Sequence, residues 1–261
     1  MAPVKLIHLG VGGRGTWPVS FVAEQSDPHF QSVGLVDISD EALAEAREVS
    51  GLGEEACFTS LTDALAAVEA DAVAIITSPG IHAPQCMEAI AAGAAPPHSC
   101  YPTSPPPSLD RAARAGKHLL VEKPFTKSLA EAVEIMDAAD AAGVKVMVCQ
   151  NDRFRSGADT LAALAAGGSL GQPYFGLMTR FGNRPGVKHS GEDDHAYLWE
   201  RGIHDLDTIC HIFSSTPAKI FCDSFNPPWS PYKGVRCPAP RTLPARGLRA
   251  HKLPHPSNTR S

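Results

Sequence analysis

Short apolar runs alternate with amphipathic stretches through the first 150 residues. The apolar runs are Val4–Leu9, Ser32–Val36, Ala72–Thr77, Leu119–Val121 and Val144–Cys149. Continuous apolar runs of this length predict strands that are buried on both faces. Strands of this kind separated by helices are typical of a parallel sheet with helices on both sides. We therefore predict an α/β fold in which residues 1–150 form a doubly wound parallel sheet.

The stretches between these runs carry helix signals. Ser39 precedes two acidic residues, the arrangement expected of an N-cap followed by a favourable first turn. Ser128 and Glu131 have the spacing of a capping box, and Gly143 marks the end of that helix. Two further helices are predicted, over Leu61–Val68 and Ala83–Ala92.

The pattern changes from Asn151 onwards. The predicted helices there are Thr160–Ala166 and Tyr197–Phe213, and the predicted strands are Tyr174–Phe181 and Lys219–Phe225. This mixture of strands and helices predicts a second unit, an incomplete α+β domain over residues 151–234.

Two segments show neither helical nor strand periodicity. They are the proline-rich Ala94–Gly116 and the C-terminal Val235–Ser261. We predict that both are disordered. The C-terminal segment has six Lys or Arg and no Asp, Glu or aromatic residue, which favours a solvated tail over a nucleic-acid site.

Composition narrows the class of protein further. The net charge of −5 does not suit a polyanion ligand, and no apolar run approaches the roughly 20 residues that span a bilayer. The N-terminus runs directly into a strand pattern, unlike a signal peptide. The seven cysteines are scattered and form no C-x-x-C pair, which predicts reduced thiols, no metal site and a cytoplasmic protein.

A glycine-rich loop joins the first predicted strand to the helix that follows it. Gly10, Gly12 and Gly15 form the pattern G-x-G-x-x-G. In dinucleotide-binding folds the first glycine permits the turn, the second lets the backbone approach a pyrophosphate, and the third lets helix and strand pack closely. The helix N-terminus adds N–H donors for the phosphates. Because glycine-rich turns are common, the prediction also depends on the elements around the loop.

Asp37 ends the second predicted strand, 22 residues after Gly15. This is close to the spacing of about 20 residues expected for the acidic residue that binds the adenosine ribose. Its carboxylate would accept from ribose hydroxyls and repel a 2′-phosphate, which favours NAD. Arg14 leaves NADP possible, because a guanidinium in the loop can pair with a phosphate. The alternative is that Asp37 only caps a helix.

Lys123 follows the strand Leu119–Val121, at the end where open α/β sheets bind ligands. An ammonium group there can donate to a substrate oxygen and polarise a C–OH or C=O group. Glu122 would contribute to the electrostatics of the cleft, and Pro124 restricts the backbone after the lysine. A surface lysine at a strand end is the alternative, and spacing alone does not decide between the two.

Glu200, His204 and Asp207 share one face if the segment around them is helical. A carboxylate–imidazole pair suits proton abstraction from an alcohol, because the histidine takes the proton while the acid orients the ring. A metal site would also need His211, at a spacing that is not a standard ligand set. The alternative is a helix whose polar face merely holds acids and histidines. Elsewhere, His82 either faces the cofactor or caps a helix.

Taken in order, these motifs resemble the Gfo/Idh/MocA family of NAD(P)-dependent oxidoreductases. The matching residues are Gly10 to Gly15, Asp37, Thr77-Ser78-Pro79 with His82, Glu122-Lys123-Pro124, Asn151 to Phe154 and Gly202 to Asp207. The E-K-P motif after a strand combined with the G-x-H-x-x-D helix is specific. The resemblance implies an N-terminal Rossmann domain followed by an α/β domain with a large open sheet.

The resemblance also implies an activity and the residues behind it. Family members move a hydride between a nicotinamide cofactor and a hydroxyl or ketone of a sugar, cyclitol or related polyol. For this chain it implies catalysis by Lys123, His204 and Glu200, and substrate contacts by Arg153 and Asp207. The implied cofactor-binding residues are Gly10, Gly12, Gly13, Arg14, Gly15, Asp37, Ser78, His82, Glu122 and Lys123. The implied cofactor is NAD, with NADP possible, and no metal is implied.

The chain departs from the family pattern in three places. Many members have Asp where Glu200 stands. Ala94–Gly116 interrupts a helix-to-strand connection, and we interpret it as a retained intron or a lineage-specific loop. The strands expected after Gly234 do not follow, which argues against the homo-oligomer contacts that the family makes through that sheet.

A non-catalytic dinucleotide-binding sensor or regulator on the same fold is the alternative function, and an NAD-dependent glycosidase is a third. Lys123 and His204 together favour chemistry, because a sensor does not need the pair. The expected partner is a small sugar or polyol, without nucleic acid or membrane.

Overall fold

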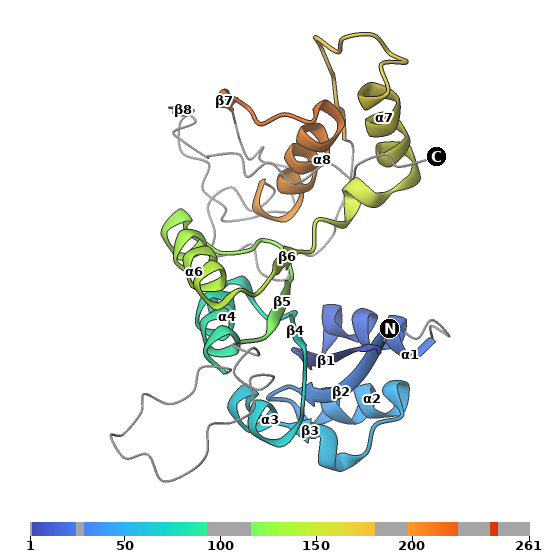
Figure 1. Ribbon diagram of the computed structural model, residues 1–261, viewed down its shortest axis with the longest axis vertical. Helices are drawn as coiled ribbons and strands as arrows, with labels where there is room; N and C mark the ends of the chain where they lie inside the picture. The colour runs from blue at the N-terminus through green and yellow to red at the C-terminus, as the bar shows by residue number, and fades with distance from the viewer. Residues whose placement is uncertain (1, 25–28, 93–115, 181–197, 224–240, 245–261) are drawn as a thin grey trace, which may run out of the picture. The chain divides into compact units, whose positions relative to one another are not determined.

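The computed structural model describes residues 2–24, 29–92, 116–180, 198–223 and 241–244 (Figure 1). The chain divides into two compact units, Met1–Cys149 and Gln150–Ser261.

The first unit is built on a six-stranded parallel sheet in the order β3-β2-β1-β4-β5-β6. Its strands are β1 (Val4–Leu9), β2 (Phe30–Val36), β3 (Cys57–Phe58), β4 (Ala72–Ile75), β5 (His118–Val121) and β6 (Val146–Val148). This is the Rossmann strand order, with its reversal between β1 and β4, and it confirms the predicted doubly wound sheet. Strand β3 was not predicted, because two residues are too few to leave a periodic pattern.

Helices cover both faces of this sheet. They are α1 (Thr16–Glu24), α2 (Asp40–Ser50), α3 (Leu61–Ala67), α4 (His82–Ala91) and α6 (Leu129–Ala142), with 3-10 turns η1 (Gly13–Gly15), η2 (Glu54–Ala56) and η3 (Pro79–Ile81). The predicted caps are confirmed: the Ser39 side chain accepts from the N–H of Ala42, and Ser128 and Glu131 form the capping box. Gly143 ends α6 in the left-handed conformation.

Apolar side chains on the two sides of the sheet pack against different helices. Ile7 and Val121 belong to a buried cluster with residues of α3, α4 and α6. On the other side, Leu35 packs with Val19 of α1 and Leu43 of α2. Successive residues of a strand point to opposite faces of the sheet, and helices cover both faces. The predicted strands are therefore mainly apolar on both faces.

The second unit is mainly helical in its described part. Its elements are the 3-10 turn η4 (Asn151–Phe154), α7 (Ser156–Ala166), the π-helical turn η5 (Leu198–Gly202), α8 (Ile203–Phe213), β7 (Lys219–Cys222) and β8 (Arg241–Pro244). Helix α8 lies against α7 and η4, and β7 pairs with β8 in antiparallel fashion. None of the helices in the described ranges has the length and apolar character that crossing a membrane requires.

Two expectations for this unit were wrong where the structure describes them. Residues 173–180 form no strand, although Tyr174–Phe181 was predicted to be one. Its alternating apolar side chains are mostly exposed, and alternation alone does not hold a strand without a neighbour to pair with. Arg241–Pro244 pairs as β8 within the stretch predicted to be disordered. Residues 93–115, 235–240 and 245–261 lie outside the described ranges.

Candidate active site

The loops that follow four strands meet at the carboxyl edge of the parallel sheet. The first residue of each loop donates its N–H to the last residue of the neighbouring strand. These bonds are Gly10 to Val36, Ile76 to Leu9, Glu122 to Ile75 and Cys149 to Val121, at 2.8, 2.8, 2.9 and 2.8 Å. These four hydrogen bonds run along the edge of the sheet. They place the glycine loop in the middle of the edge, with Asp37 on one side and Glu122 on the other.

The glycine loop has the geometry that its sequence predicted. Gly10 has a φ of +83°, and a Cβ there would lie 2.8 Å from the carbonyl oxygen of Ile76. A Cβ on Gly15 would lie 1.7 Å from the carbonyl oxygen of Gly10, so the start of the helical segment packs directly on the turn. Gly13 also has a positive φ, of 54°. The loop thus forms the close turn that a dinucleotide pyrophosphate requires.

Asp37 is bonded to the glycine loop and to the start of α2. Its Oδ2 accepts from the N–H groups of Val11 and Gly12 at 2.9 and 3.1 Å, and its Oδ1 accepts from the N–H of Ser39 at 3.0 Å. A carboxylate has about four acceptor positions, so the geometry leaves capacity for a ribose hydroxyl. Asp37 therefore has a structural role, because it joins the glycine loop to the start of α2. Its contact with the ribose stays a prediction.

Lys123 is half-buried in the loop after β5, and its peptide bond with Pro124 is cis. His82 links this loop to the loop after β4. Its Nδ1 lies 3.1 Å from the carbonyl oxygen of Pro124, and its Nε2 lies 3.1 Å from that of Thr77. Because the ring is fully buried, His82 acts in the structure by fixing the loop that carries Lys123. Its predicted cofactor contact stays a prediction, as does that of Ser78, which is exposed nearby.

Glu122 connects the glycine loop with the end of β6. Its Oε1 lies 3.7 Å from Nε of Arg14. Burial raises the pKa of the Cys149 thiol, and the charge and hydrogen bond of Glu122 add to this while Arg14 opposes it, so that the pKa is about 12. The thiol therefore stays neutral at physiological pH. The charged groups at this point are the carboxylate of Glu122 and the guanidinium of Arg14. This pairing shows that Lys123 and the glycine loop belong to one edge of one domain.

His204 lies in the first turn of α8 and is buried. Glu200 precedes it in the π-helical turn η5, so the two residues do not share the single regular α-helix that the sequence predicted. A π-helical turn has a different residue spacing from an α-helix. The orientation of His204 by Glu200 stays a prediction.

The two predicted substrate residues are paired with each other. Arg153 of η4 donates from Nε to Oδ2 of Asp207 at 2.8 Å and makes a second bond to Oδ1. This bidentate geometry is the strong form of an arginine–carboxylate pair. It fastens η4 to α8 one turn from His204, and substrate contact by either residue stays a prediction.

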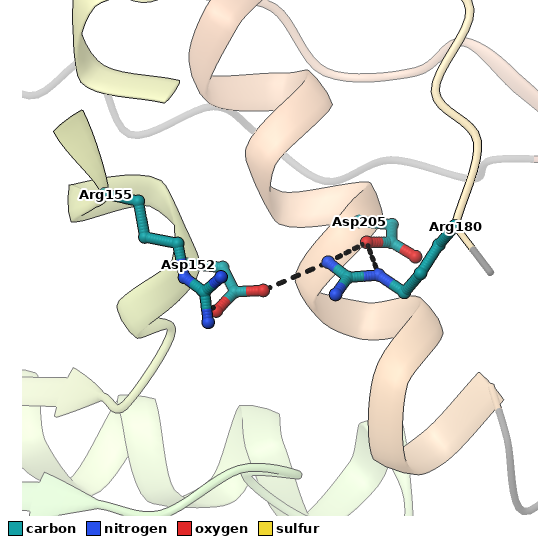
Figure 2. Close-up of polar contacts among 4 residues, drawn as sticks. All are labelled: Asp152, Arg155, Arg180 and Asp205. Carbon is teal, nitrogen blue, oxygen red and sulfur yellow. Dashed lines mark hydrogen bonds and ion pairs between the residues drawn. The ribbon is translucent and has the colours of Figure 1, made fainter. Parts of the chain in front are cut away.

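A second group of charges, shown in Figure 2, joins η4 and α8 to residue Arg180. Arg180 donates to Asp205 from Nε at 2.8 Å and to Asp152 at 3.1 Å. Asp152 is buried and also pairs with Arg155, at 3.1 Å. Sequence reasoning missed this group, because nothing in the spacing of Arg180 shows which acids it meets 25 and 28 residues away.

Lys123 and His204 lie in different compact units. Their approach to one bound cofactor is therefore still a prediction. Within the described ranges, no group of three or more His, Cys, Asp or Glu could hold a metal ion.

A Rossmann sheet with a glycine loop and an acidic residue at its carboxyl edge defines the class of dinucleotide-binding proteins. Comparison with known proteins narrows this class. The model of the GFO_IDH_MocA family, described as an oxidoreductase family with an NAD-binding Rossmann fold, matches residues 104–150. That range holds β5, the Glu122-Lys123-Pro124 motif, α6 and β6.

Two curated relatives are similar to the chain over most of its length. An uncharacterized protein of Sinorhizobium fredii is 28% identical over 238 residues, which cover 88% of this chain and 59% of the relative. D-apiose dehydrogenase of Paraburkholderia graminis is 26% identical over 184 residues, or 69% of this chain and 42% of that protein. The chain thus spans about half the length of the curated relatives it matches.

Solved structures share the fold at lower identity. A probable dehydrogenase from Thermotoga maritima is 18% identical with a TM-score of 0.68, covering 88% of this chain and 61% of that one. Scyllo-inositol dehydrogenase from Lactobacillus casei, solved with NAD(H) and scyllo-inositol, is 17% identical with a TM-score of 0.59, covering 84% and 57%. Together these matches show that the chain resembles NAD-binding oxidoreductases of the Gfo/Idh/MocA family, whose model matches residues 104–150.

Proposed function

We propose that the chain binds NAD at the carboxyl edge of the Rossmann sheet and oxidises a CH–OH group of a sugar, cyclitol or related polyol. In this reaction the carbinol carbon gives a hydride to nicotinamide C4, the hydroxyl gives a proton to the enzyme, and the products are a ketone and NADH. The observation that carries the proposal is the single edge shared by the glycine loop, Asp37 and the Lys123 loop. A lone glycine loop would support binding only.

The residues present fit the cofactor. Gly10, Gly12 and Gly15 leave the space that side chains would fill, and a pyrophosphate there would lie at the N-terminus of the α1 segment. We propose that the carboxylate of Asp37 accepts from the adenosine ribose. When bound, NAD supplies the hydride acceptor, and the protein supplies position and charge.

Two side chains are proposed to handle the substrate hydroxyl. The ammonium of Lys123 donates to the substrate oxygen and stabilises the negative charge that develops as the proton leaves. The imidazole of His204 accepts that proton. Both residues are at least half-buried, which strengthens such charge interactions relative to water.

The substrate class rests on the relatives and on the chemistry of the second unit. D-apiose and scyllo-inositol are polyhydroxy compounds, and each is in the name of a similar dehydrogenase. Arg153 and Asp207 offer donors and acceptors next to His204 on η4 and α8. Cys57, Cys86, Cys149, Cys210 and Cys222 are free, and we propose the reducing cytoplasm as the compartment.

The test combines binding and turnover on the full chain. NAD⁺ is titrated by calorimetry, and a panel of aldoses, inositols and other polyols is screened for NADH formation. The proposal expects NAD⁺ binding and turnover of at least one polyol. Binding without turnover on any of them would instead favour the dinucleotide-binding sensor, and absence of NAD⁺ binding would contradict both.

A matched pair of histidine variants tests the proton acceptor. His204→Asn is expected to lower turnover at least about 100-fold, the usual range for removing a general base. His211→Asn on the same helix is the control, because its Nε2 lies 3.9 Å from Asp159 of α7. Equal losses in the two variants would contradict the role of His204.

A further inference from the structure

We infer that Glu122 makes the chain selective for NAD over NADP by holding Arg14 away from the adenosine ribose. The inference rests on the proposed NAD binding. It goes beyond that proposal, because it assigns the discrimination against the 2′-phosphate of NADP to Glu122. This residue lies on the opposite side of the carboxyl edge of the sheet from Asp37.

Two contacts hold Arg14, one to the loop after β5 and one to α1. Its Nε lies 3.7 Å from Oε1 of Glu122, and its guanidinium carbon lies 5.9 Å from the centre of the Trp17 ring. A cation within about 6 Å of an indole face is attracted by the ring. Trp17 in turn stacks on Phe21, with ring centroids 5.5 Å apart, so the aromatic support is itself held along α1.

Glu122 is a stronger anchor than an acid on the surface. Its side chain is only 11% exposed, whereas that of Arg14 is 58% exposed. Exposed ion pairs contribute little because water screens both charges. A carboxylate that is largely shielded from water attracts a positive charge more strongly, because the dielectric constant around it is lower. The neighbouring Cys149 thiol has no positive charge and does not compete with Arg14 for Glu122.

The register of the sheet gives the distance over which this anchor acts. Asp37 follows β2 and Glu122 follows β5, and the order β2-β1-β4-β5 separates them by three strand spacings. Neighbouring strands lie about 4.8 Å apart, so the strand ends that carry the two residues are roughly 14 Å apart along the edge. A guanidinium next to Glu122 is therefore too far away to neutralise a 2′-phosphate beside Asp37.

The strand order also shows where the Arg14 side chain can move when its pair with Glu122 is broken. The glycine loop is rooted at the end of β1, which neighbours β2 directly and is two spacings from β5. Two residues before Arg14, Gly12 already donates its N–H to Asp37. A long, flexible side chain on this loop can therefore turn towards the β2 end, where it can pair with a phosphate.

Calorimetric titration of NAD⁺ and NADP⁺ into the full chain tests the inference. The proteins are the wild type, Glu122→Gln, Arg14→Ala, the double variant and Arg47→Ala as a charge-matched control near the far end of α2. Glu122→Gln is expected to tighten NADP⁺ binding about tenfold relative to NAD⁺, the size of one charge-assisted contact. The double variant is expected to lose this gain.

Arg14→Ala alone provides a second measurement that does not depend on the Glu122 variant. It is expected to change the NADP⁺ affinity less than about twofold beyond the Arg47→Ala control, because the guanidinium is not at the 2′ position. A tenfold loss of NADP⁺ affinity would overturn the inference, and so would an unchanged NADP⁺ to NAD⁺ ratio in a folded Glu122→Gln variant. Failure of the wild type to bind NAD⁺ would overturn the proposed function as well.

Discussion

The two units of the chain are stabilised in different ways. The first unit has three clusters of buried apolar side chains around a parallel sheet. In the described part of the second unit, Ala162 is the one buried apolar side chain, and η4, residues 173–180 and α8 are joined by arginine–aspartate bonds. Apolar burial is non-directional, whereas these ion pairs depend on charge state and on salt.

The difference bears on where each unit can tolerate change. A cofactor edge on a packed sheet keeps its geometry when a surface charge is lost. We expect a buried histidine on a helix that is held by ion pairs to move when one pair is broken. We therefore expect steric changes to dominate in the first unit and electrostatic changes in the second.

The largest expected effect is steric and lies in the glycine loop. Gly15→Ala would put a Cβ 1.7 Å from the carbonyl oxygen of Gly10, so the backbone must shift. We expect a loss of about 3 kcal/mol or more in unfolding free energy, together with loss of NAD⁺ binding. Thermal unfolding and calorimetry measure the two effects.

Gly13→Ala is the control in the same loop. No atom lies within 4 Å of its added Cβ, and only its φ of +54° is unfavourable for alanine. We expect a cost of about 1 kcal/mol. Equal destabilisation by the two substitutions would mean that close packing at Gly15 does not shape the loop.

The next effect tests the ion pairs of the second unit. Arg180→Ala removes a partner from buried Asp152 and from Asp205. We expect a loss of about 2 kcal/mol, because a buried carboxylate then lacks part of its compensation. Urea unfolding at low and high salt measures it.

Glu69→Ala is the matched control in the first unit, where Glu69 pairs with Lys5 at 3.2 Å in an exposed position. Its cost should stay within about 0.5 kcal/mol. A similar small cost for Arg180→Ala would contradict the view that ion pairs fasten α8.

A further effect, on the stability of the first unit, depends on pH. His8 of β1 is buried, with its Nε2 2.9 Å from Oγ of Ser32, and burial lowers its pKa from 6.5 to about 4. The unfolded chain takes up a proton at His8 below pH 6.5, whereas the native chain resists it. Stability from this group is thus complete above pH 6.5 and is lost as the pH falls towards 4. The loss should reach about 2 kcal/mol at pH 5.

His8→Gln provides the reference for this titration. The variant keeps a polar side chain but has no proton to gain, so the difference in unfolding free energy between it and the wild type should shrink from pH 7 to pH 5. Urea unfolding at several pH values gives this difference. A constant difference would show that His8 is not kept neutral by burial.

Much of the first unit was visible in the sequence. The strand Val4–Leu9, the N-cap Ser39 and the capping box at Ser128 depend on neighbours within a few residues, and each was confirmed. The order of the glycine loop and the Lys123 motif along the chain also predicted their common edge, because parallel strands end on the same side.

The remainder depends on contacts between residues far apart in the sequence. No local pattern indicates that Arg14 turns to Glu122, that Arg180 meets Asp152, or that His8 is buried within an apolar strand. Strand Tyr174–Phe181 was predicted from alternation alone, and residues 173–180 lack it. Local periodicity shows which face can be buried but not whether a partner covers it.

The most direct test of the central claim is the turnover of Lys123→Ala on a polyol oxidised by the wild type. Lys127→Ala, on the same loop and exposed, removes an equal charge as the control. We expect Lys123→Ala to reduce NADH formation at least about 1,000-fold while its NAD⁺ affinity stays within about threefold, and Lys127→Ala to behave like the wild type. Turnover by Lys123→Ala equal to that of Lys127→Ala would contradict the assignment of this edge as an active site.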